Sequence, residues 1–578
     1  MIKLIKNLTK KDYIYAFISF ILIVAQVALE LKMPDFMSKV TVLVQSDGSK
    51  MGEILLNGLY MMLCAFLSLI STIIVGYLVA SISASFSLIT RKKLFEKVEN
   101  LSLAEVKKFN VSSLITRTTN DITQIEMLIA TGLMLLVKAP LTAIWAVTKI
   151  LNKNYTWSIA TLVAVVFLLL VVAILTIIVV PKFKLIQKLT DKLNSVTREN
   201  LTGIRVVRAF NAESYQQNKF DNVNKDLTNK QLFNQRTFSI MMPVMYLTMH
   251  TLALSIYFIG AILIKDSILS DKISLFGDMV VFSSYAIQVI ISFLMLAVIF
   301  MIMPRASVSA KRINEVLDEE ITIKDGKVKT SKEKGTIEFK NVSFKYPDAD
   351  EYILEDISFK VEKGETVAFI GSTGSGKSTL INLIPRFYDV TDGEVLVDNI
   401  NVKDYELKSL YNKLGYVSQK AVIFSSSVKD NVMFGNKNSA DYKSAVEVSC
   451  AKEFVEKLDE NYLSHIAASG TNISGGQKQR LSIARAIARN PEIFIFDDSF
   501  SALDYKTDAT LRKNLKKYAK DSTVLIVAQR IGTIMNADKI IVLDEGKCVG
   551  MGTHKELLKN CEIYKQIALS QLSIKEVL

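Results

Sequence analysis

Nine consecutive residues in the second half of the chain read Gly371-Ser372-Thr373-Gly374-Ser375-Gly376-Lys377-Ser378-Thr379. An apolar run that predicts a strand, Val367–Ile370, precedes them, and an apolar run that predicts a helix, Leu380–Ile384, follows. The glycines allow the backbone to curl so that successive N–H groups face an anion, and the helix N-terminus adds a favourable dipole. The pattern GxxxxGK(S/T) between a strand and a helix is typical of a loop that binds nucleotide phosphates. We call residues 371–379 the phosphate loop.

The residue types in and near the phosphate loop predict ATP and Mg²⁺ as ligands. Lys377 can neutralise β- and γ-phosphate oxygens, and the hydroxyl of Ser378 can ligate Mg²⁺. A second buried strand is predicted over Ile493–Asp497, and it ends in a carboxylate. A strand that ends in Asp is a weak signal alone, but beside a phosphate loop it is a strong one. We therefore expect Asp497 to hold Mg²⁺ through water.

A second turn of small residues, Ile473-Ser474-Gly475-Gly476-Gln477, opens the long basic helix predicted over Lys478–Ala488. We call residues 473–477 the signature turn. Its flexible backbone again exposes N–H groups at a helix start, so it can bind a second phosphate. A capped helix start without a ligand is the alternative. One chain by itself has no evident use for two phosphate-binding devices.

Long apolar runs dominate the first half of the chain. Six of them have about 20 or more mostly apolar residues, enough to cross ~30 Å of hydrocarbon. They are Ile14–Leu31, Leu55–Val79, Ile129–Ile150, Ile159–Val180, Met241–Ile264 and Met279–Met303. Half of all residues are hydrophobic (50%) and the net charge is +13. Together these features predict a membrane protein with lysine-rich loops, and they argue against nucleic acid as a binding partner.

The placement of lysine and arginine predicts the orientation of the six spans. Basic residues cluster in Lys3–Lys11, after the second span in Arg91–Lys108, and after the fourth in Lys182–Lys192. The positive-inside rule places these segments and both termini in the cytoplasm of a multi-pass protein of the cytoplasmic membrane. The Lys-, Asn- and Ile-rich composition suits a bacterium. Lys138 lies inside the third span, either as a functional charge or as a side chain that extends to the inner interface, and we favour the second interpretation.

Nearly the whole chain resembles an ATP-binding cassette (ABC) exporter half-transporter. The matching residues are the phosphate loop, Tyr346 in Phe344–Pro347, Gln419 in Gly415–Gln419, the signature turn, Asp497, and Asp504 in Ser501–Asp504. The resemblance implies an α-helical membrane domain of six transmembrane helices fused to an α/β P-loop NTPase domain. We expect the membrane domain over residues 1–320, a linker over 321–335 and the nucleotide-binding domain over 336–578.

The resemblance also implies how nucleotide is held. Tyr346 would stack on adenine, and Gln419 would contact Mg²⁺ and couple the domains. In this family two nucleotide-binding domains pair head to tail. The signature turn, with Ser474, Gly475, Gly476 and Gln477, then closes over the ATP of a second half-transporter. Asp504 lies in the family's D-loop and would also be part of the nucleotide site.

The inner connections of the membrane domain are long. About 45–50 residues separate spans two and three, and about 60 separate spans four and five, so the spans are expected to continue as helices into the cytoplasm. Short elements near Ser112–Glu126 and Arg205–Phe220 are expected to contact a nucleotide-binding domain. By resemblance, they would transmit the closure of two ATP-bound domains to the spans.

Two departures from the family pattern lie at the predicted catalytic positions. Asp498 stands where the family has the Glu that deprotonates water, and Gln529 stands where it has a His that contacts the γ-phosphate. Asp is one methylene shorter than Glu, and misplacement of this order can cost ~10²-fold in rate. Gln529 can donate a hydrogen bond but cannot become cationic. Before the signature turn, Ala468-Ser469-Gly470 replaces the family's Glu-Arg-Gly.

These residues predict a site that binds ATP without hydrolysing it well. The expected function is ATP-driven export of an amphipathic drug, lipid or peptide. The chain would form half of a heterodimer whose other chain carries the missing Glu and His. The alternatives are a homodimeric exporter with slow hydrolysis, and an ATP-gated channel or sensor without sustained turnover. The identity of the substrate does not follow from the sequence.

Overall fold

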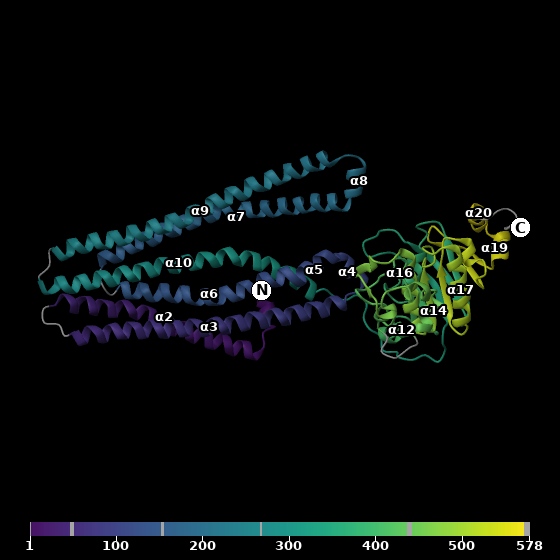
Figure 1. Cartoon of the computed structure of the whole chain (residues 1–578), viewed down its shortest axis with the longest axis horizontal. Helices are drawn as coiled ribbons and strands as arrows, with labels where there is room; N and C mark the ends of the chain where they lie inside the picture. Colours follow the sequence, from purple (N-terminus) through teal and green to yellow (C-terminus); the bar gives the residue numbers. More distant parts are fainter. Residues whose placement is uncertain (1, 47–50, 152–154, 266–268, 436–441, 572–578) are drawn as a thin grey trace. The chain divides into compact units, whose positions relative to one another are not determined.

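The computed structural model of the protein describes residues 2–46, 51–151, 155–265, 269–435 and 442–571. The chain folds into two compact units. One consists of Met1–Glu99 and Val111–Glu319, and we call it the helical unit. The other consists of Asn100–Asn110 and Glu320–Leu578, and we call it the sheet unit. Figure 1 labels many of the helices of both.

Six long helices form most of the helical unit. They are α2 (Lys10–Gln45), α3 (Met51–Glu99), α6 (Ile122–Leu151), α7 (Tyr155–Thr202), α9 (Glu213–Lys265) and α10 (Leu269–Leu317). The described residues contain six helices that are long and apolar enough to cross a membrane, which confirms the six predicted spans. With a rise of about 1.5 Å per residue, the 53 residues of α9 extend far beyond ~30 Å of hydrocarbon.

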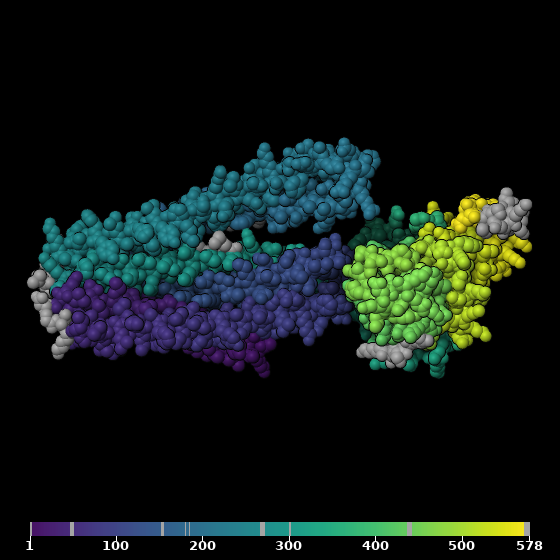
Figure 2. All heavy atoms as spheres, viewed as in Figure 1, coloured from purple at the N-terminus to yellow at the C-terminus, as the bar shows by residue number. Residues whose placement is uncertain are grey.

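The long helices associate chiefly in pairs, α2 with α3, α6 with α10, and α7 with α9. Figure 2 shows that the α7–α9 pair diverges from the other helices of the unit toward its end at α8 (Ile204–Ala209). The short elements of the unit are α1 (Ile2–Ile5), α5 (Val111–Thr116) and a π-helix (Arg117–Asp121) that leads into α6. A π-helical turn of this kind is a local widening of the helix.

Lys138 forms an ion pair inside the helical unit. Its Nζ lies 2.8 Å from Oε1 of Glu30 on α2, and the two side chains are only 13% and 23% exposed. Gln26 and Ser68 donate hydrogen bonds to the same oxygen. A carboxylate on a neighbouring helix therefore pairs with Lys138, and the extension of this side chain to the inner interface stays a prediction.

The sheet unit contains two main sheets. The antiparallel sheet has the order β2-β1-β4-β5, and the larger sheet has the order β12-β11-β3-β10-β9-β6. A short pair, β7–β8, completes the strands. The strands are β1 (Ile337–Phe344), β2 (Leu354–Val361), β3 (Thr366–Gly371), β4 (Asp392–Val397), β5 (Ile400–Asn401), β6 (Leu414–Val417), β7 (Ser426–Ser427), β8 (His465–Ile466), β9 (Ile493–Asp497), β10 (Thr523–Val527), β11 (Lys539–Asp544) and β12 (Lys547–Gly552).

The sheet unit also contains eleven short helices within the described residues. They are α4 (Leu103–Phe109), α11 (Lys377–Leu383), α12 (Leu407–Lys413), α13 (Val428–Val432), α14 (Tyr442–Val448), α15 (Lys452–Val455), α16 (Gly475–Ala488), α17 (Tyr505–Tyr518), α18 (Ile531–Ile534), α19 (His554–Asn560) and α20 (Glu562–Gln571). Two 3₁₀ turns, Asn461–Leu463 and Ala468–Gly470, precede α16.

The larger sheet positions the site. Its strands β9 and β10 are buried along their whole length, as expected of parallel strands covered on both faces. Strands β6, β9, β10 and β3 run parallel, so their C-terminal ends share one edge. Ligands of such sheets bind outside the carboxyl ends of the strands. The residues that follow these strands are therefore brought together at one edge.

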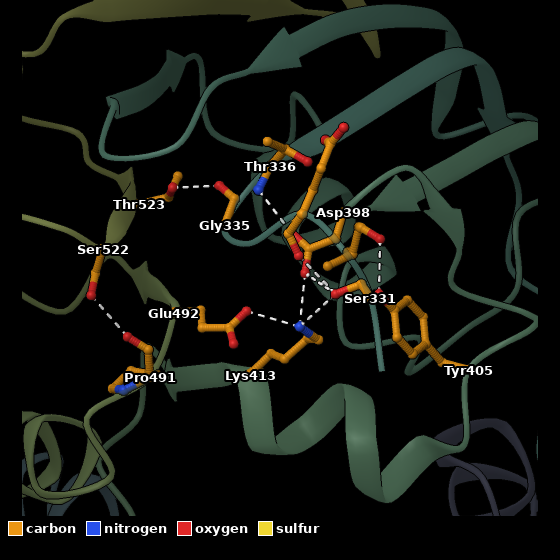
Figure 3. A network of polar contacts seen from close by, with 12 residues as sticks. Ser331, Gly335, Thr336, Asp398, Tyr405, Lys413, Pro491, Glu492, Ser522 and Thr523 are labelled. Atoms are coloured by element: carbon orange, nitrogen blue, oxygen red, sulfur yellow. Dashed lines mark hydrogen bonds and ion pairs between the residues drawn. The ribbon is translucent and has the colours of Figure 1, made fainter. Parts of the chain in front are cut away.

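A buried polar network lies where several strands begin (Figure 3). Nζ of Lys413, just before β6, lies 2.8 Å from Oδ2 of Asp398 and 2.8 Å from Oε2 of Glu492. It also donates to Ser331, and Asp398 accepts from the backbone N–H of Thr336. The network joins the segment before β1 to the starts of β6 and β9, so it fixes that segment to the sheet.

Candidate nucleotide site

The phosphate loop connects β3 to α11, and at two of its glycines an added Cβ would clash with neighbouring atoms. Gly371 has φ +156°, and a Cβ there would lie 1.9 Å from the carbonyl oxygen of Leu543. Gly376 has φ +91°, and a Cβ there would lie 2.7 Å from the side chain of Leu354. The glycines thus allow the loop to curl against its neighbours, as the sequence pattern predicts.

Lys377 is held inside the curl of the loop. Its Nζ donates to the carbonyl oxygens of Gly371 (2.9 Å) and Ser372 (2.6 Å) and to Oγ of Ser375 (3.2 Å). Burial lowers the pKa of Lys377 below its ordinary value, although the nearby carboxylates of Asp498 and Asp497 act in the opposite sense. A buried cation at the centre of the loop suits the binding of a polyphosphate.

Two of the three predicted Mg²⁺ ligands, Ser378 and Asp497, lie in direct contact. Oγ of Ser378 donates to Oδ1 of Asp497 over 2.7 Å. Burial raises the pKa of Asp497 above its ordinary value, and the neighbouring carboxylate of Asp498 adds to the rise. Oxygen donors of this kind fit Mg²⁺. The described residues contain no group of three or more His, Cys, Asp or Glu that could hold a metal ion, so Mg²⁺ here would depend on phosphate oxygens as further ligands.

Two predicted site residues, Gln529 and Gln419, donate to one carboxylate oxygen of a third, Asp498. Oδ2 of Asp498 accepts from Nε2 of Gln529 (3.1 Å) and from Nε2 of Gln419 (3.3 Å). Asp498 is buried and its φ is +46°, in the left-handed region that residues with a Cβ seldom adopt. Burial raises the pKa of Asp498, against the effect of the hydrogen bond from Gln419 and the charge of Lys377.

Tyr346 lies beside the phosphate loop, just after β1. Its hydroxyl is 3.0 Å from Oγ1 of Thr379, the last residue of the loop. The ring of Tyr388 lies 5.2 Å away at an interplanar angle of 88°. The structure thus brings the predicted adenine-stacking residue to the phosphate loop.

The signature turn caps α16. Oγ of Ser474 accepts from the backbone N–H of Gln477 (3.3 Å), and Oε1 of Gln477 accepts from the backbone N–H of Ser474 (2.8 Å). This is a capping box, which satisfies two N–H groups of the helix start. Within the described part of the chain, these two side chains bond to each other's backbone at the start of α16. A Cβ at Gly476 would lie 3.2 Å from the carbonyl oxygen of Ala502, so the turn packs beside Ser501–Asp504.

Asp504 caps the following helix. Its Oδ1 accepts from the backbone N–H of Thr507 (2.9 Å) at the start of α17. The hydrogen bonds with Thr507 lower the pKa of Asp504, so this exposed carboxylate is ionised at neutral pH. Its observed role in the described residues is that of a helix cap.

The inner turn between α3 and α6 lies earlier in the chain than predicted. The residues that belong to the sheet unit are Asn100–Asn110 with helix α4, whereas Ser112–Glu126 forms α5, the π-helix and the start of α6 in the helical unit. The reason is a local stop signal. Ser102 and Glu105 form a capping box that starts α4, and Asn110 ends it with φ +62°. The Ser-x-x-Glu pattern was the signal that could have located this helix.

The segment Arg205–Phe220 holds helix α8 and the start of α9, as expected of a turn element. Its contact with a nucleotide-binding domain stays a prediction.

Comparisons with known proteins agree with this architecture. The family described as "ABC transporter transmembrane region" matches residues 16–293, and the family described as "ABC transporter" matches residues 354–501. An uncharacterized ABC transporter ATP-binding protein of Mycobacterium tuberculosis is 36% identical over 551 residues, 93% of each chain.

Relatives with more specific names are similar over most of their length. An ATP-dependent lipid A-core flippase of Pseudomonas putida is 32% identical and covers 84% of this chain and 80% of its own. A putative multidrug export ATP-binding/permease protein of Bacillus subtilis is 32% identical and covers 82% of both chains. A solved structure of a bacterial Atm1-family ABC exporter with ATP bound has the same fold, with a TM-score of 0.82, 22% identity and coverage of 96% of this chain and 98% of that one.

The family of the chain follows from three findings. They are the six apolar helices, the sheet domain with its phosphate loop, and the relatives that match both along nearly the whole chain. The chain is a multi-pass membrane protein of the ABC transporter family, an exporter half-transporter whose transport is coupled to an ATPase domain.

Proposed function

We propose that this chain exports an amphipathic compound across the cytoplasmic membrane of a bacterium, with both termini in the cytoplasm. It works as one half of a heterodimer and contributes an ATP site that hydrolyses ATP weakly. The observation that carries the proposal is the arrangement around Asp498, whose Oδ2 already accepts from Gln529 and Gln419.

A carboxylate in this arrangement is a poor general base. General-base assistance is typically worth ~10²–10⁴-fold and requires the base within hydrogen-bond reach of the water. The side chain of Asp498 is one methylene shorter than that of Glu, and one of its carboxylate oxygens accepts hydrogen bonds from two amide groups. Gln529 is neutral, so it cannot offset charge on the γ-phosphate as a protonated His can. Both features weaken hydrolysis.

The same site keeps the groups that bind ATP. The phosphate loop surrounds the ammonium of Lys377, Ser378 and Asp497 together present oxygen ligands for Mg²⁺, and Tyr346 lies at the end of the loop for the base. Mg²⁺, when bound, supplies positive charge to the β- and γ-phosphate oxygens. ATP therefore binds and stays in this site longer than in a competent one.

The signature turn is the reason to propose a partner with a competent site. Its capping box orders the N-terminus of α16, and helix N-termini bind phosphates. In the head-to-tail dimer this turn closes over ATP held by the partner, which carries the Glu and His that this chain replaces. Closure over two ATP molecules favours the state in which contacts from both chains form, and hydrolysis in the partner's site releases it.

The helical unit supports an amphipathic substrate. A cavity of about 120 Å³ lies among α7, α9 and α10, and every lining residue is apolar. Its lining consists of Leu168, Leu169, Val172, Met241, Met245, Phe293 and Leu296. Such a lining suits an aromatic ring or part of an acyl chain. The names of the relatives, a lipid A-core flippase and a multidrug exporter, concern compounds of this class.

The decisive experiment purifies this chain alone and together with a half-transporter that carries Glu and His at the two positions. In proteoliposomes we expect ATPase activity and ATP-dependent uptake of a fluorescent amphipathic dye only from the mixed pair. Brisk hydrolysis and uptake by the chain alone would establish the homodimeric exporter instead. Dye flux that follows its gradient and needs ATP binding but no hydrolysis would establish the ATP-gated channel.

A further inference from the structure

Helix α4 brings a lysine to the tyrosine that is proposed to stack on adenine. Nζ of Lys107 lies 5.0 Å from the ring centre of Tyr346 and 5.4 Å from that of Tyr388. In the chain, α4 is the turn between the long helices α3 and α6, yet it belongs to the sheet unit. Within the sheet unit, a residue of the turn between α3 and α6 therefore contacts the tyrosine at the edge of the candidate nucleotide site.

The position of α4 is fixed by a buried carboxylate. Glu105 is 3% exposed and accepts from the backbone N–H of Ser102 (2.6 Å) and from Oγ1 of Thr322 (2.7 Å). Lys107 lies two positions after Glu105. It is an exposed residue, but its ammonium group reaches the rings of Tyr346 and Tyr388. The hydroxyl of Tyr388 raises the pKa of Lys107 above its ordinary value, so the side chain is cationic at neutral pH.

The ring of Tyr346 is itself held in place. Phe344 and Tyr388 both pack against it nearly at right angles, with ring centres 5.0 Å and 5.2 Å away. Its hydroxyl is 3.0 Å from Thr379 of the phosphate loop. Since the Lys107 ammonium takes one face of the ring, a base that stacks on Tyr346 must use the other face.

A cation over one face of an aromatic ring is attracted by the ring's negative quadrupole. It restrains the ring in one orientation and withdraws electron density from it. Both effects favour the stacking of a base on the opposite face. A restrained ring is already oriented for stacking, and a ring with less electron density repels the electron-rich face of the base less strongly.

We propose that Lys107 is a positioning residue for ATP, which strengthens the binding of the adenine base by acting through Tyr346. The proposal rests on the proposed function, in which Tyr346 stacks on the base. It gives α4 a direct sensitivity to nucleotide, because the lysine and the base share one ring.

The test measures nucleotide binding by the full-length chain in nanodiscs, by calorimetry with Mg²⁺ and either ATP or inorganic tripolyphosphate, which has no base. The variants are Lys107→Met, Lys107→Arg, Tyr346→Leu and the double variant Lys107→Met/Tyr346→Leu. Lys108→Met is the matched control, because that exposed lysine lies over the ring of Phe109 on its own helix (5.7 Å). Thermal unfolding checks that each variant is folded.

We expect Lys107→Met to raise the Kd for ATP about two- to fivefold, the change that corresponds to a cation–π contact at an exposed site. The Kd for tripolyphosphate should stay the same, Lys107→Arg and Lys108→Met should resemble the wild type, and Lys107→Met should have no further effect when Tyr346 is Leu.

Two results would overturn the proposal while leaving the proposed function intact. An unchanged or tighter ATP Kd for Lys107→Met would mean that the lysine is idle or competes with the base. Equal weakening of ATP and tripolyphosphate would mean a charge or folding effect. If Tyr346→Leu leaves the ATP Kd unchanged, the stacking on which both rest is itself wrong.

Discussion

Gln529 donates a hydrogen bond to Asp498, with 3.1 Å between Nε2 and Oδ2. The two residues are 31 positions apart in the chain, and each follows the end of a buried parallel strand, β10 and β9. A neutral amide cannot accept a proton from water, and here it donates to the carboxylate that stands at the predicted water-activating position. Under the proposed function, we therefore expect the pair to favour ATP binding over hydrolysis.

The first prediction concerns this pair of residues. In the mixed pair of half-transporters, Asp498→Asn should change the ATPase rate less than twofold, because the partner's site performs the hydrolysis. Steady-state phosphate release in proteoliposomes measures this rate. A variant of the partner that replaces its Glu by Gln is the control and should lose at least tenfold. Loss of turnover on Asp498→Asn would be incompatible with an asymmetric pair.

The second prediction concerns the signature turn. A Cβ at Gly475 meets no atom within 4 Å in this chain, so Gly475→Ala should leave the fold of the chain unchanged. In the mixed pair the added methyl group should obstruct the approach of the helix N-terminus to the partner's γ-phosphate and lower the ATPase rate more than tenfold. Phosphate release by the pair measures the loss.

A matched control for Gly475→Ala is Gly532→Ala, since a Cβ at Gly532 also meets no atom within 4 Å. Gly532 lies in α18 and should tolerate the change in the ATPase assay. If both variants are fully active, the signature turn does not contact a partner's nucleotide.

The third prediction concerns the buried network around Lys413. Lys413→Met leaves Asp398, whose side chain is 0% exposed, without its counter-charge. Breaking a buried ion pair by removing one partner typically costs about 3–5 kcal/mol, so the free energy of unfolding should fall by that order. Urea denaturation, followed by far-ultraviolet circular dichroism, measures this free energy. Ser331→Ala, which removes only one hydroxyl of the network, should cost about 1 kcal/mol.

The pH dependence of this effect has a definite sign. Burial alone would lower the pKa of Lys413, but the hydrogen bonds to Asp398 and Glu492 outweigh it and raise the pKa above its ordinary value. The pairing thus adds stability that is fully present below the pKa of an unfolded lysine, about 10.4, and is lost as the pH rises through the higher folded value. The stability difference between wild type and Lys413→Met should therefore be constant near neutral pH and shrink above about pH 10.4.

The fourth prediction concerns the ion pair within the membrane helices. Glu30→Gln and Lys138→Met should each lower the melting temperature of the chain in nanodiscs, because each leaves one charge buried without its partner. The double variant Glu30→Gln/Lys138→Met should be more stable than either single variant, since it leaves no unpaired charge. Additive losses in the double variant would show that the two side chains do not interact.

The sequence was sufficient for the features that depend on residues close together in the chain. The phosphate loop is one, because glycine spacing, a preceding strand and a following helix are all local. The six spans are another, because a run of about 20 apolar residues is enough to cross hydrocarbon wherever it lies. The replacement of Glu and His by Asp498 and Gln529 could also be read directly from the family pattern.

Only the tertiary structure decided which distant residues meet. Gln419 and Gln529 reach the same oxygen of Asp498 because β9 lies between β6 and β10 in the sheet, an order that no local pattern encodes. Glu30 and Lys138 are 108 residues apart and pair because α2 packs beside α6, which gives the lysine a counter-charge inside the helical unit. Lys107 meets Tyr346 for the same physical reason: the packing of separate elements, and not the spacing of residues along the chain, sets contacts between side chains that are far apart in sequence.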